Sequence, residues 1–266
     1  MDLKMSKKVA VIIGASKGIG FATAKAFLNE GAIVAICARN KNELEKAKET
    51  LSTYGEVYAA PIDATSMEEV NNFADQVYSQ YGHIDYWINN VGATIEKQGE
   101  NYTNQEIDWI VDICFKTVIY GCQAASKYMA NTGGSIVNVS SLAARCGTVG
   151  RSTLYGPLKS AVCSLSVMYA GEYAAYGIRV NSILPGFTAT PKVEESISDN
   201  ELLHNAENTL LRRVATPEEI AGPIVFLCSQ QASYITATSL EVSGGRSVVL
   251  NPSYSYDLKK NLNGYK

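Results

Sequence analysis

The chain has few histidines, no closely spaced cysteines and no long apolar run. Only two histidines occur among 266 residues, and the six cysteines include no C-x-x-C pair. This pattern argues against a zinc site or a disulfide framework and is typical of reduced thiols. The longest wholly apolar run covers residues 32–38, and the first eight residues lack the apolar core of a signal peptide. We therefore expect a soluble, cytoplasmic protein with no metal, no transmembrane helix and no secretory leader.

An excess of positive charge is also missing. The sequence holds 23 lysines and arginines against 26 aspartates and glutamates, which gives a net charge of −3, and the cations form no stripe. Nucleic acid and anionic membrane surfaces are therefore not expected as partners. Any bound anion must be held by local geometry.

Short apolar runs rich in β-branched residues alternate with amphipathic stretches along the whole chain. Continuous apolar runs suit strands that are covered on both faces, and the β-α-β alternation predicts an α/β fold with a doubly wound parallel sheet flanked by helices. No linker divides the chain, so one domain is expected. The predicted strands are 9–13, 33–38, 57–62, 84–89, 135–139 and 180–184, and the predicted helices are 19–29, 42–54, 66–81, 104–130 and 153–176. Capping boxes also predict three helix starts, at Ser66 with Glu69, Thr103 with Glu106 and Thr216 with Glu219.

A glycine-rich stretch, Gly14–Gly20, joins the first predicted strand to the first predicted helix with the spacing G-x-x-x-G-x-G. Glycine lets the backbone turn tightly and approach a diphosphate, while the N–H groups at the helix start face the anion. The loop is therefore a candidate phosphate cradle. A tight strand-to-helix turn without a ligand would also explain it.

Polar residues follow the second and third strands, at the edge where a doubly wound sheet binds its ligand. The second strand ends at Arg39 and Asn40, where NAD binding would require a carboxylate for the ribose 2′-hydroxyl. Arginine instead suits a 2′-phosphate, and Lys17 in the glycine loop adds a second positive charge. The pair favours NADP over NAD, although two solvated surface cations remain an alternative. Asp63, followed by Ala64, is placed to accept a hydrogen bond from an adenine amino group.

Tyr155 and Lys159 are a candidate pair for proton transfer at a carbonyl oxygen. They lie four residues apart, so they share one face of a helix, and an ammonium beside a phenol favours the phenolate. A second Y-x-x-x-K match occurs at Tyr256 and Lys260 in the tail. The first pair follows the strand that delivers Ser140–Ser141, whose hydroxyls can bind the same carbonyl oxygen. We therefore interpret the tail pair as a chance match.

These motifs together resemble the short-chain dehydrogenase/reductase family over residues 8–245. The set comprises Gly14–Gly20, the N-N-x-G sequence at Asn89–Gly92, Ser140–Ser141, Tyr155–Lys159 and Pro185–Gly186, in that order. The resemblance implies a single-domain, Rossmann-like fold and a nicotinamide cofactor. It also implies that residues 1–245 form the catalytic domain and that residues 246–266 are a C-terminal extension.

The resemblance also implies roles for individual residues. Tyr155 would be the catalytic acid or base, Lys159 would bind the nicotinamide ribose and favour the phenolate, and Ser141 would polarise the carbonyl. The cations at the cofactor end resemble those of NADP-preferring members, including tropinone-reductase-like and 3-oxoacyl-reductase-like enzymes. The implied cofactor-binding residues are Gly14, Ser16, Lys17, Gly18, Ile19, Gly20, Arg39, Asn40, Asp63, Ala64, Asn90, Gly92, Tyr155, Lys159, Pro185, Gly186, Phe187, Thr188 and Thr190.

The sequence departs from the family pattern at several positions. Cys114 stands where the family has a catalytic asparagine that holds a water of a proton relay, and a thiol bonds to water only weakly. Ser140 remains an alternative to Ser141. Ser243 replaces the usual aspartate in the closing strand, expected at 242–245. Pro157 is tolerable only in the first turn of its helix.

Three functions remain open at this stage. The first is an NADPH-dependent reductase of a small or medium neutral ketone, because the expected pocket segments 93–96, 142–153 and 187–213 are mostly apolar. The second is a 3-oxoacyl-carrier-protein reductase, which would need a basic docking patch. The third is a cofactor-binding protein whose catalysis is impaired by Cys114. The candidate residues of the basic docking patch, which the second function requires, are Arg145, Arg151, Arg212 and Arg213.

The predicted helices 104–130 and 153–176 are more apolar than a one-sided surface helix requires. The family resemblance points the same way, to a homotetramer or homodimer. The extension after residue 245 is either a frayed tail or an arm over a neighbouring subunit.

Overall fold

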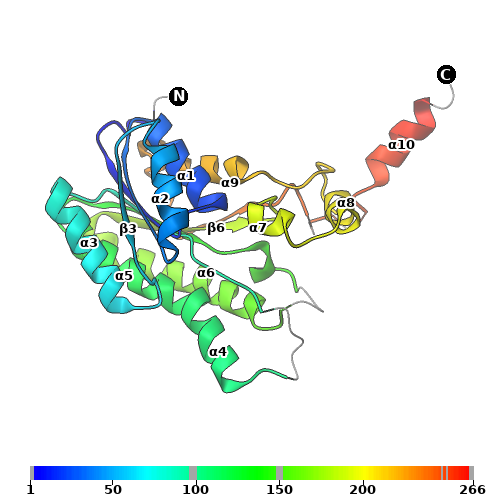
Figure 1. The fold of residues 1–266 in the computed structure, drawn as a ribbon. Coiled ribbons are helices and arrows are strands. Elements are labelled where there is room, and N and C mark those ends of the chain that lie inside the picture. The colour runs from blue at the N-terminus through cyan, green and yellow to red at the C-terminus, as the bar shows by residue number, and fades with distance from the viewer. Residues whose placement is uncertain (1–2, 96–100, 148–151, 247, 250, 264–266) are drawn as a thin grey trace.

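The fold is a single seven-stranded parallel sheet between two layers of helices (Figure 1). The computed structural model describes residues 3–95, 101–147, 152–246, 248–249 and 251–263. The strand order is β3-β2-β1-β4-β5-β6-β7, so the chain leaves β3 at one edge and returns to the middle at β4. The strands are β1 (Val9–Ile13), β2 (Ile33–Ala38), β3 (Val57–Pro61), β4 (Tyr86–Asn89), β5 (Gly134–Val139), β6 (Ile178–Pro185) and β7 (Ser239–Val242).

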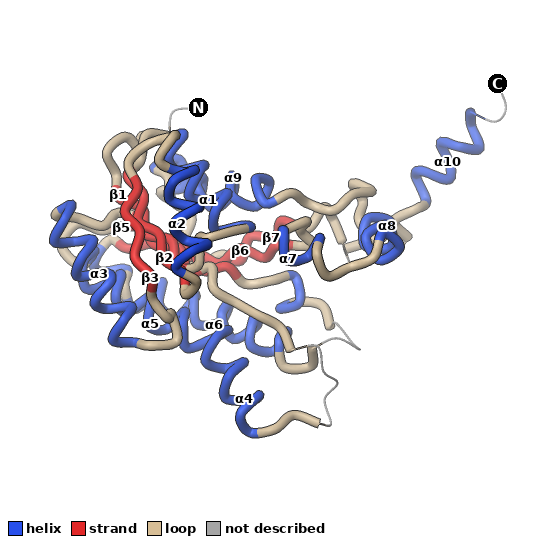
Figure 2. The backbone as a smooth tube through the Cα atoms, viewed as in Figure 1, coloured by secondary structure: helices blue, strands red, loops and turns tan. Residues whose placement is uncertain are grey.

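Each face of the sheet has its own apolar core, because successive side chains of a strand point to opposite faces. In β1, Val9, Val11 and Ile13 enter one core and Ala10 and Ile12 enter the other, so the whole strand is buried. One core packs against α1 (Gly18–Asn29), α2 (Lys41–Leu51) and α9 (Pro217–Cys228). The other packs against α3 (Met67–Tyr81), α5 (Thr117–Met129) and α6 (Tyr155–Glu172). Figure 2 shows the strands enclosed between these layers.

The six predicted strands are all present, and each boundary lies within two residues of its predicted position. The closing strand was predicted wrongly at 242–245, because β7 ends at Val242 and Gly244 and Gly245 turn with φ of +63° and +75°. The predicted helix 104–130 is divided into α4 (Asn104–Val111), a π-helical turn η1 (Asp112–Lys116) and α5. The predicted helix 153–176 ends earlier, at Glu172, and a 3-10 turn η3 (Ala174–Tyr176) follows.

Polar residues fix the starts of several helices. The Thr103 side chain and Glu106 form a reciprocal capping box at α4. Ser66 accepts the Glu69 N–H at α3, but the Glu69 carboxylate turns back to the backbone N–H of Asp63 at 2.7 Å, so the predicted box is only half formed. Pro157 is the third residue of α6, within the first turn, where its missing N–H costs no helical bond.

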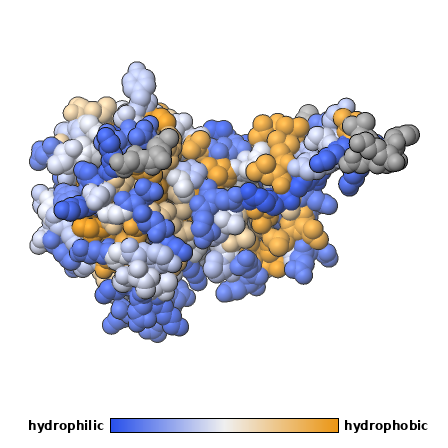
Figure 3. Space-filling view, turned by 90° about the horizontal axis from the view of Figure 1, so that it is seen from above, coloured by the Kyte–Doolittle hydropathy of each residue, from blue (hydrophilic) through white to orange (hydrophobic). Residues whose placement is uncertain are grey.

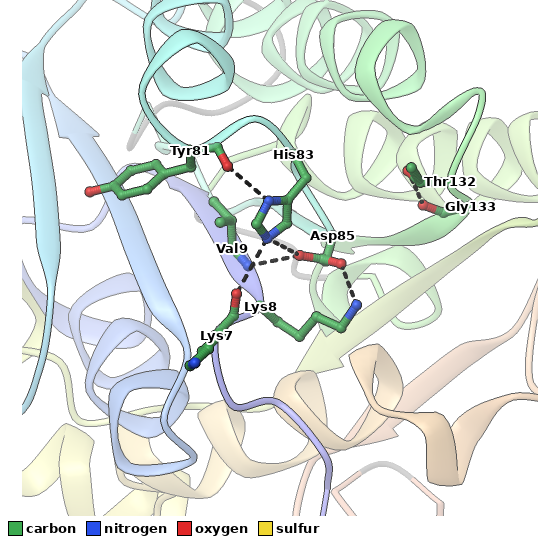
Figure 4. A network of polar contacts seen from close by, with 8 residues as sticks. All are labelled: Lys7, Lys8, Val9, Tyr81, His83, Asp85, Thr132 and Gly133. Carbon is green, nitrogen blue, oxygen red and sulfur yellow. Dashed lines mark hydrogen bonds and ion pairs between the residues drawn. The ribbon is translucent and has the colours of Figure 1, made fainter.

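An ion-pair network joins β1 to β4 at the amino-terminal edge of the sheet (Figure 4). One oxygen of Asp85 accepts the Lys8 ammonium at 2.8 Å, and the other accepts the backbone N–H of Val9 at 2.8 Å. His83 lies 3.4 Å from the same carboxylate and bonds to the Tyr81 carbonyl oxygen at 2.9 Å. The network therefore holds the two central strands together at the edge opposite the strand carboxyl ends.

A series of buried side-chain hydrogen bonds connects β4, β5 and α6 beneath the carboxyl ends of the strands. The Trp87 indole N–H donates to Asn89 Oδ1 at 2.8 Å, the Asn89 amide donates to Asn138 at 2.8 Å, and the Asn138 amide donates to Ser166 at 2.9 Å. A Cβ atom at Gly121 would overlap Asn89 Oδ1. These hydrogen bonds fix α6, which carries Tyr155 and Lys159, relative to the sheet.

Three helices after β6 were not predicted: α7 (Pro191–Glu194), α8 (Asp199–Glu207) and α10 (Tyr254–Asn263). Helix α10 projects away from the body (Figure 1). At its base the Tyr256 hydroxyl donates to the Leu210 carbonyl oxygen at 2.8 Å, and the Arg212 guanidinium lies 4.8 Å from the Tyr256 ring centre. Apolar side chains gather at the same end of the molecule in Figure 3. Among the described residues, no helix has the length and apolar character needed to cross a bilayer.

Candidate active site

The candidate site lies at the carboxyl ends of the central strands, between the neighbours β1 and β4, where the order in which successive strands are added to the sheet reverses. The glycine loop after β1 and the segment after β4 meet there. The Asn90 amide donates to the Gly14 carbonyl oxygen at 2.6 Å. A Cβ at Gly20 would collide with the same oxygen, so glycine is required for this close packing.

The geometry of the glycine loop fits a phosphate cradle. Gly14 and Gly18 have φ of +84° and +60°, in the left-handed region that favours glycine. Helix α1 starts directly behind the loop, and its N-cap residue, Lys17, provides no side-chain cap. The first N–H groups of α1, which include those of Ile19 and Gly20, therefore remain directed at an incoming anion. Ser16, just before this cap, is partly exposed.

The loop after β6 lies against the glycine loop, as the predicted cofactor set requires. A Cβ at Gly18 would lie 3.3 Å from Thr190 Cγ2. Gly186 packs against Ser243, since a Cβ there would be 2.8 Å from Ser243 Cα. Pro185 ends β6 beside Val242 of β7. The Phe187 carbonyl accepts the Ala215 N–H at 3.0 Å, and Thr188 Oγ1 donates to the Gly186 carbonyl at 3.1 Å.

The end of the site that is predicted to hold the adenosine of the cofactor contains two cations, which differ in their surroundings. Lys17 Nζ lies 3.6 Å from Glu43 Oε1, and both side chains are about half exposed. Arg39 follows β2 and has no ion-pair partner within the described ranges. The Asn40 side chain caps α2 by accepting the N–H groups of Asn42 and Glu43 at 3.0 and 3.2 Å. The side chain of Asn40, a residue predicted to bind the cofactor, is therefore used in capping α2.

Asp63 lies in a tight local turn after β3. Its Oδ1 accepts the backbone N–H of Thr65 at 3.0 Å and the Thr65 hydroxyl at 2.8 Å. Ala64 is buried beside it. The turn holds the Asp63 carboxylate at the end of the sheet on the same side as Arg39.

Lys159 is the centre of the predicted catalytic pair and is only 2% exposed. Its ammonium donates to the Val139 carbonyl oxygen at 2.9 Å and lies 5.7 Å from the centre of the Tyr155 ring. A Cβ at Gly92 would be 3.0 Å from Lys159 Nζ. The structure thus brings Tyr155, Lys159 and Gly92 together from α6 and the segment after β4.

The two serines after β5 have different surroundings. Ser140 is buried, and its hydroxyl donates to the Lys159 carbonyl oxygen at 2.8 Å and accepts the Cys163 thiol at 3.3 Å. Ser141 is partly exposed and accepts the Ala143 N–H at 3.1 Å, at the start of the 3-10 turn η2 (Leu142–Ala144). The Ser140 hydroxyl proton is therefore used in a buried hydrogen bond to a backbone carbonyl. Within the described ranges, the Ser141 hydroxyl proton has no acceptor of this kind.

Cys114 lies in the π-helical turn η1 and is fully buried. Its thiol donates to the Ala93 carbonyl oxygen at 3.1 Å, one residue after Gly92. Asp112 pairs instead with Lys116 at 2.6 Å, so it does not replace the missing asparagine. The π-helical turn and its contact to Ala93 were missed by the sequence reasoning, because helical periodicity carries no signal for a single wider turn.

The arginines proposed as a docking patch are mostly engaged. Arg145 donates to the Ser239 carbonyl at 3.0 Å and pairs with Glu241 at 3.4 Å. Arg212 donates to the Glu207 carbonyl at 2.8 Å, and Arg213 binds both oxygens of Glu219 at 2.5 and 2.6 Å. Arg151 lies outside the described residues, as do Glu96 and residues 148–150 of the predicted pocket segments.

Three of the buried thiols are in surroundings that disfavour the thiolate. Burial raises the pKa of Cys37, Cys122 and Cys228 to about 12 in each case. All six cysteines are free. Within the described ranges, no three histidine, cysteine or acidic side chains are grouped as a metal site would require.

Comparison with known proteins gives consistent matches over most of the chain. A family model described as Enoyl-(Acyl carrier protein) reductase matches residues 14–247. The 3-oxoacyl-[acyl-carrier-protein] reductase FabG of Thermotoga maritima is 33% identical over 250 residues, which cover 91% of this chain and 99% of that protein. A tropinone reductase homolog of Datura stramonium is 29% identical over 245 residues, covering 90% and 91% of the two chains.

A solved structure shows the same arrangement. The L-sorbose reductase from Gluconobacter frateurii, complexed with NADPH and L-sorbose, superposes with a TM-score of 0.87 at 29% identity, covering 94% of this chain and all of that one. The sequence match of the family model stops at residue 247, so α10 lies beyond it.

Proposed function

The chain belongs to the short-chain dehydrogenase/reductase family, whose members are oxidoreductases, and from that premise we propose that it transfers a hydride between NADP(H) and a ketone or secondary alcohol. The observation that carries this proposal is the buried Lys159 ammonium, which lies under Tyr155 and against Gly92. A buried charge of this kind is costly and is typical of a functional site.

In the proposed reaction the cofactor supplies a hydride and the protein supplies a proton. The bound nicotinamide supplies the hydride for the carbonyl carbon. Tyr155 donates its hydroxyl proton to the carbonyl oxygen, which completes the alcohol, and Ser141 donates a second hydrogen bond to that oxygen. Lys159 holds the ribose hydroxyls and stabilises the phenolate that remains on Tyr155.

The residues of the glycine loop and its neighbours fit the diphosphate and adenosine parts of the same cofactor. The uncapped start of α1 offers backbone N–H groups to the diphosphate. The carboxylate of Asp63 is available to the adenine amino group. Lys17 and Arg39 supply the positive charge that a 2′-phosphate requires, and on this basis we propose NADP rather than NAD. The NADPH named with L-sorbose reductase is consistent with this choice.

We propose a small or medium neutral substrate, because most of the arginines of the candidate docking patch are already paired within the protein. The alternative, a 3-oxoacyl-carrier-protein reductase, is favoured by the FabG relative. It needs cations free to receive an acidic carrier, whereas Arg145 and Arg213 are paired with glutamates and Arg212 stacks on Tyr256. The impaired-catalysis hypothesis remains a second alternative, because Cys114 has no amide to hold a relay water.

The proposal is tested by measuring oxidation of NADPH and of NADH by the purified protein across a panel of neutral ketones, sugars and 3-oxoacyl thioesters. We expect turnover with NADPH on at least one neutral ketone and its loss in Tyr155→Phe, which keeps the ring but removes the acid. Turnover only on carrier-bound thioesters would favour the alternative. Tight NADPH binding without turnover on any substrate would contradict an active reductase.

A homodimer or homotetramer is part of the same proposal. Apolar side chains are exposed at Ile107 and Trp109 on α4 and at Val167 and Met168 on α6, by 38% to 59%. Such exposed apolar groups are typical of faces that pair in an assembly. A reducing, cytoplasmic location agrees with the six free thiols. Light scattering of the purified protein tests the assembly.

A further inference from the structure

The cation in the glycine loop is already paired with an acid in the protein itself. Lys17 Nζ lies 3.6 Å from Glu43 Oε1, between the N-cap of α1 and the first turn of α2. Asn40 accepts the Glu43 N–H at 3.2 Å, so the backbone that carries this acid is fixed directly after Arg39. The carboxylate therefore lies beside Lys17, one of the two cations proposed to receive a 2′-phosphate.

An acid in this place opposes the binding of a phosphate. A 2′-phosphate carries close to two negative charges, so it must both take Lys17 from Glu43 and approach the negative charge of the Glu43 carboxylate. NADH has a 2′-hydroxyl and meets neither cost. The pair is half exposed, so the energies are modest and screened by salt.

We propose that Glu43 is a cofactor-selecting residue that moderates the preference for NADP over NAD by holding Lys17. It is a positioning residue, because it acts through Lys17 rather than on the reacting atoms. The proposal rests on the proposed nicotinamide function and concerns only the adenosine end of the site.

The test uses calorimetric titration of the purified protein with 2′,5′-ADP and 5′-AMP, which differ only in the 2′-phosphate. In Glu43→Gln we expect 2′,5′-ADP to bind about three- to fivefold more tightly, with little change for 5′-AMP. Added salt reduces this gain. Glu45→Gln is the matched control, because Glu45 lies on the same helix and is 4.0 Å from Lys48 instead. The control removes the same charge and leaves the ratio of the two affinities unchanged.

The double variant with Lys17→Gln and the wild-type affinities separate the possible outcomes. In a Lys17→Gln background, the gain from Glu43→Gln falls to less than half; an undiminished gain would overturn the ion-pair route. Unchanged or weaker binding of 2′,5′-ADP in Glu43→Gln would overturn the proposal. If the wild-type protein binds neither 2′,5′-ADP nor 5′-AMP, the proposed cofactor function fails as well. A wild-type preference for 2′,5′-ADP that Glu43→Gln does not alter would overturn the role of Glu43 alone.

Discussion

The Cys114 thiol donates a hydrogen bond to the carbonyl oxygen of Ala93 across 3.1 Å, from inside a π-helical turn. Ala93 follows Gly92, which packs against the Lys159 ammonium. The thiol thus links the helix segment before α5 to the backbone beside Tyr155 and Lys159, the proposed catalytic pair. Its position gives the residue a structural function that is separate from proton relay.

Replacing Cys114 tests this function. Cys114→Ala removes the donor to the partly buried Ala93 carbonyl, so we expect a loss of about 1 kcal/mol in the free energy of unfolding and a three- to tenfold lower kcat/KM. Cys114→Ser keeps a donor and stays within about twofold of the wild type. Urea denaturation and steady-state kinetics measure the two effects. Cys228→Ala is the control, because it removes a buried thiol far from the site and affects stability only. Equal kinetics in all three variants would refute the tie to Lys159.

Gly92→Ala tests the contact with the lysine directly. The added Cβ would lie 3.0 Å from Lys159 Nζ and must displace the ammonium. We expect kcat to fall on the order of tenfold, with the fold retained. Gly171→Ala in α6 is the matched control, since nothing lies within 4 Å of its added Cβ. That change stabilises the helix by about 0.5–1 kcal/mol and leaves kcat unchanged. Wild-type kcat in Gly92→Ala would mean that the ammonium position does not matter.

The Arg213–Glu219 pair makes stability depend on pH in the acid range. Hydrogen bonds from Arg213, and then from the Thr216 backbone, lower the pKa of Glu219 from 4.5 to about 2. Because the folded-state pKa is depressed, the stabilisation is present above the unfolded-state pKa and is lost as the pH falls toward 2. The stability difference between wild type and Glu219→Gln should therefore shrink between pH 4.5 and about 2. Denaturant titrations at low salt measure it, and a difference independent of pH would contradict the pairing.

Thiol reactivity should separate the six cysteines into two classes. Cys146 and Cys163 are partly exposed, whereas the other four are buried, and burial raises the pKa of three of these to about 12. We expect a disulfide reagent to label two thiols per chain rapidly in the folded protein and all six in denaturant. The double variant Cys146→Ser/Cys163→Ser removes the fast phase. More than two fast thiols would show that the cores open readily.

The central strands were predictable because they are buried on both faces and therefore appear as continuous apolar runs. The run Val9–Ile13 is such a case, and its predicted and observed bounds coincide. The order of polar residues at the strand ends was also predictable, since parallel strands deliver their carboxyl ends to one edge. Tyr155 and Lys159 were named from their four-residue spacing and Gly92 from the family resemblance, and the structure places the three together.

The unpredicted features depend on contacts between distant residues. Strand β7 is only partly buried along its length, so its sequence has no continuous apolar signal. The pairing of Lys17 with Glu43, and of Arg213 with Glu219, places acids beside cations that the sequence left unpaired. Helix α10 has a polar sequence, and its base is held by Arg212 and Leu210 rather than by a core.

The contact between Gly121 and Asn89 constrains how this sequence can change over evolutionary time. Any side chain at position 121 would overlap the amide oxygen that receives the Trp87 indole N–H. A larger residue there is compatible only with a smaller residue at position 89, and that change in turn leaves the indole N–H unpaired. The three positions are therefore expected to vary as a set among descendants of this chain, although the first and the last lie 34 positions apart in the sequence.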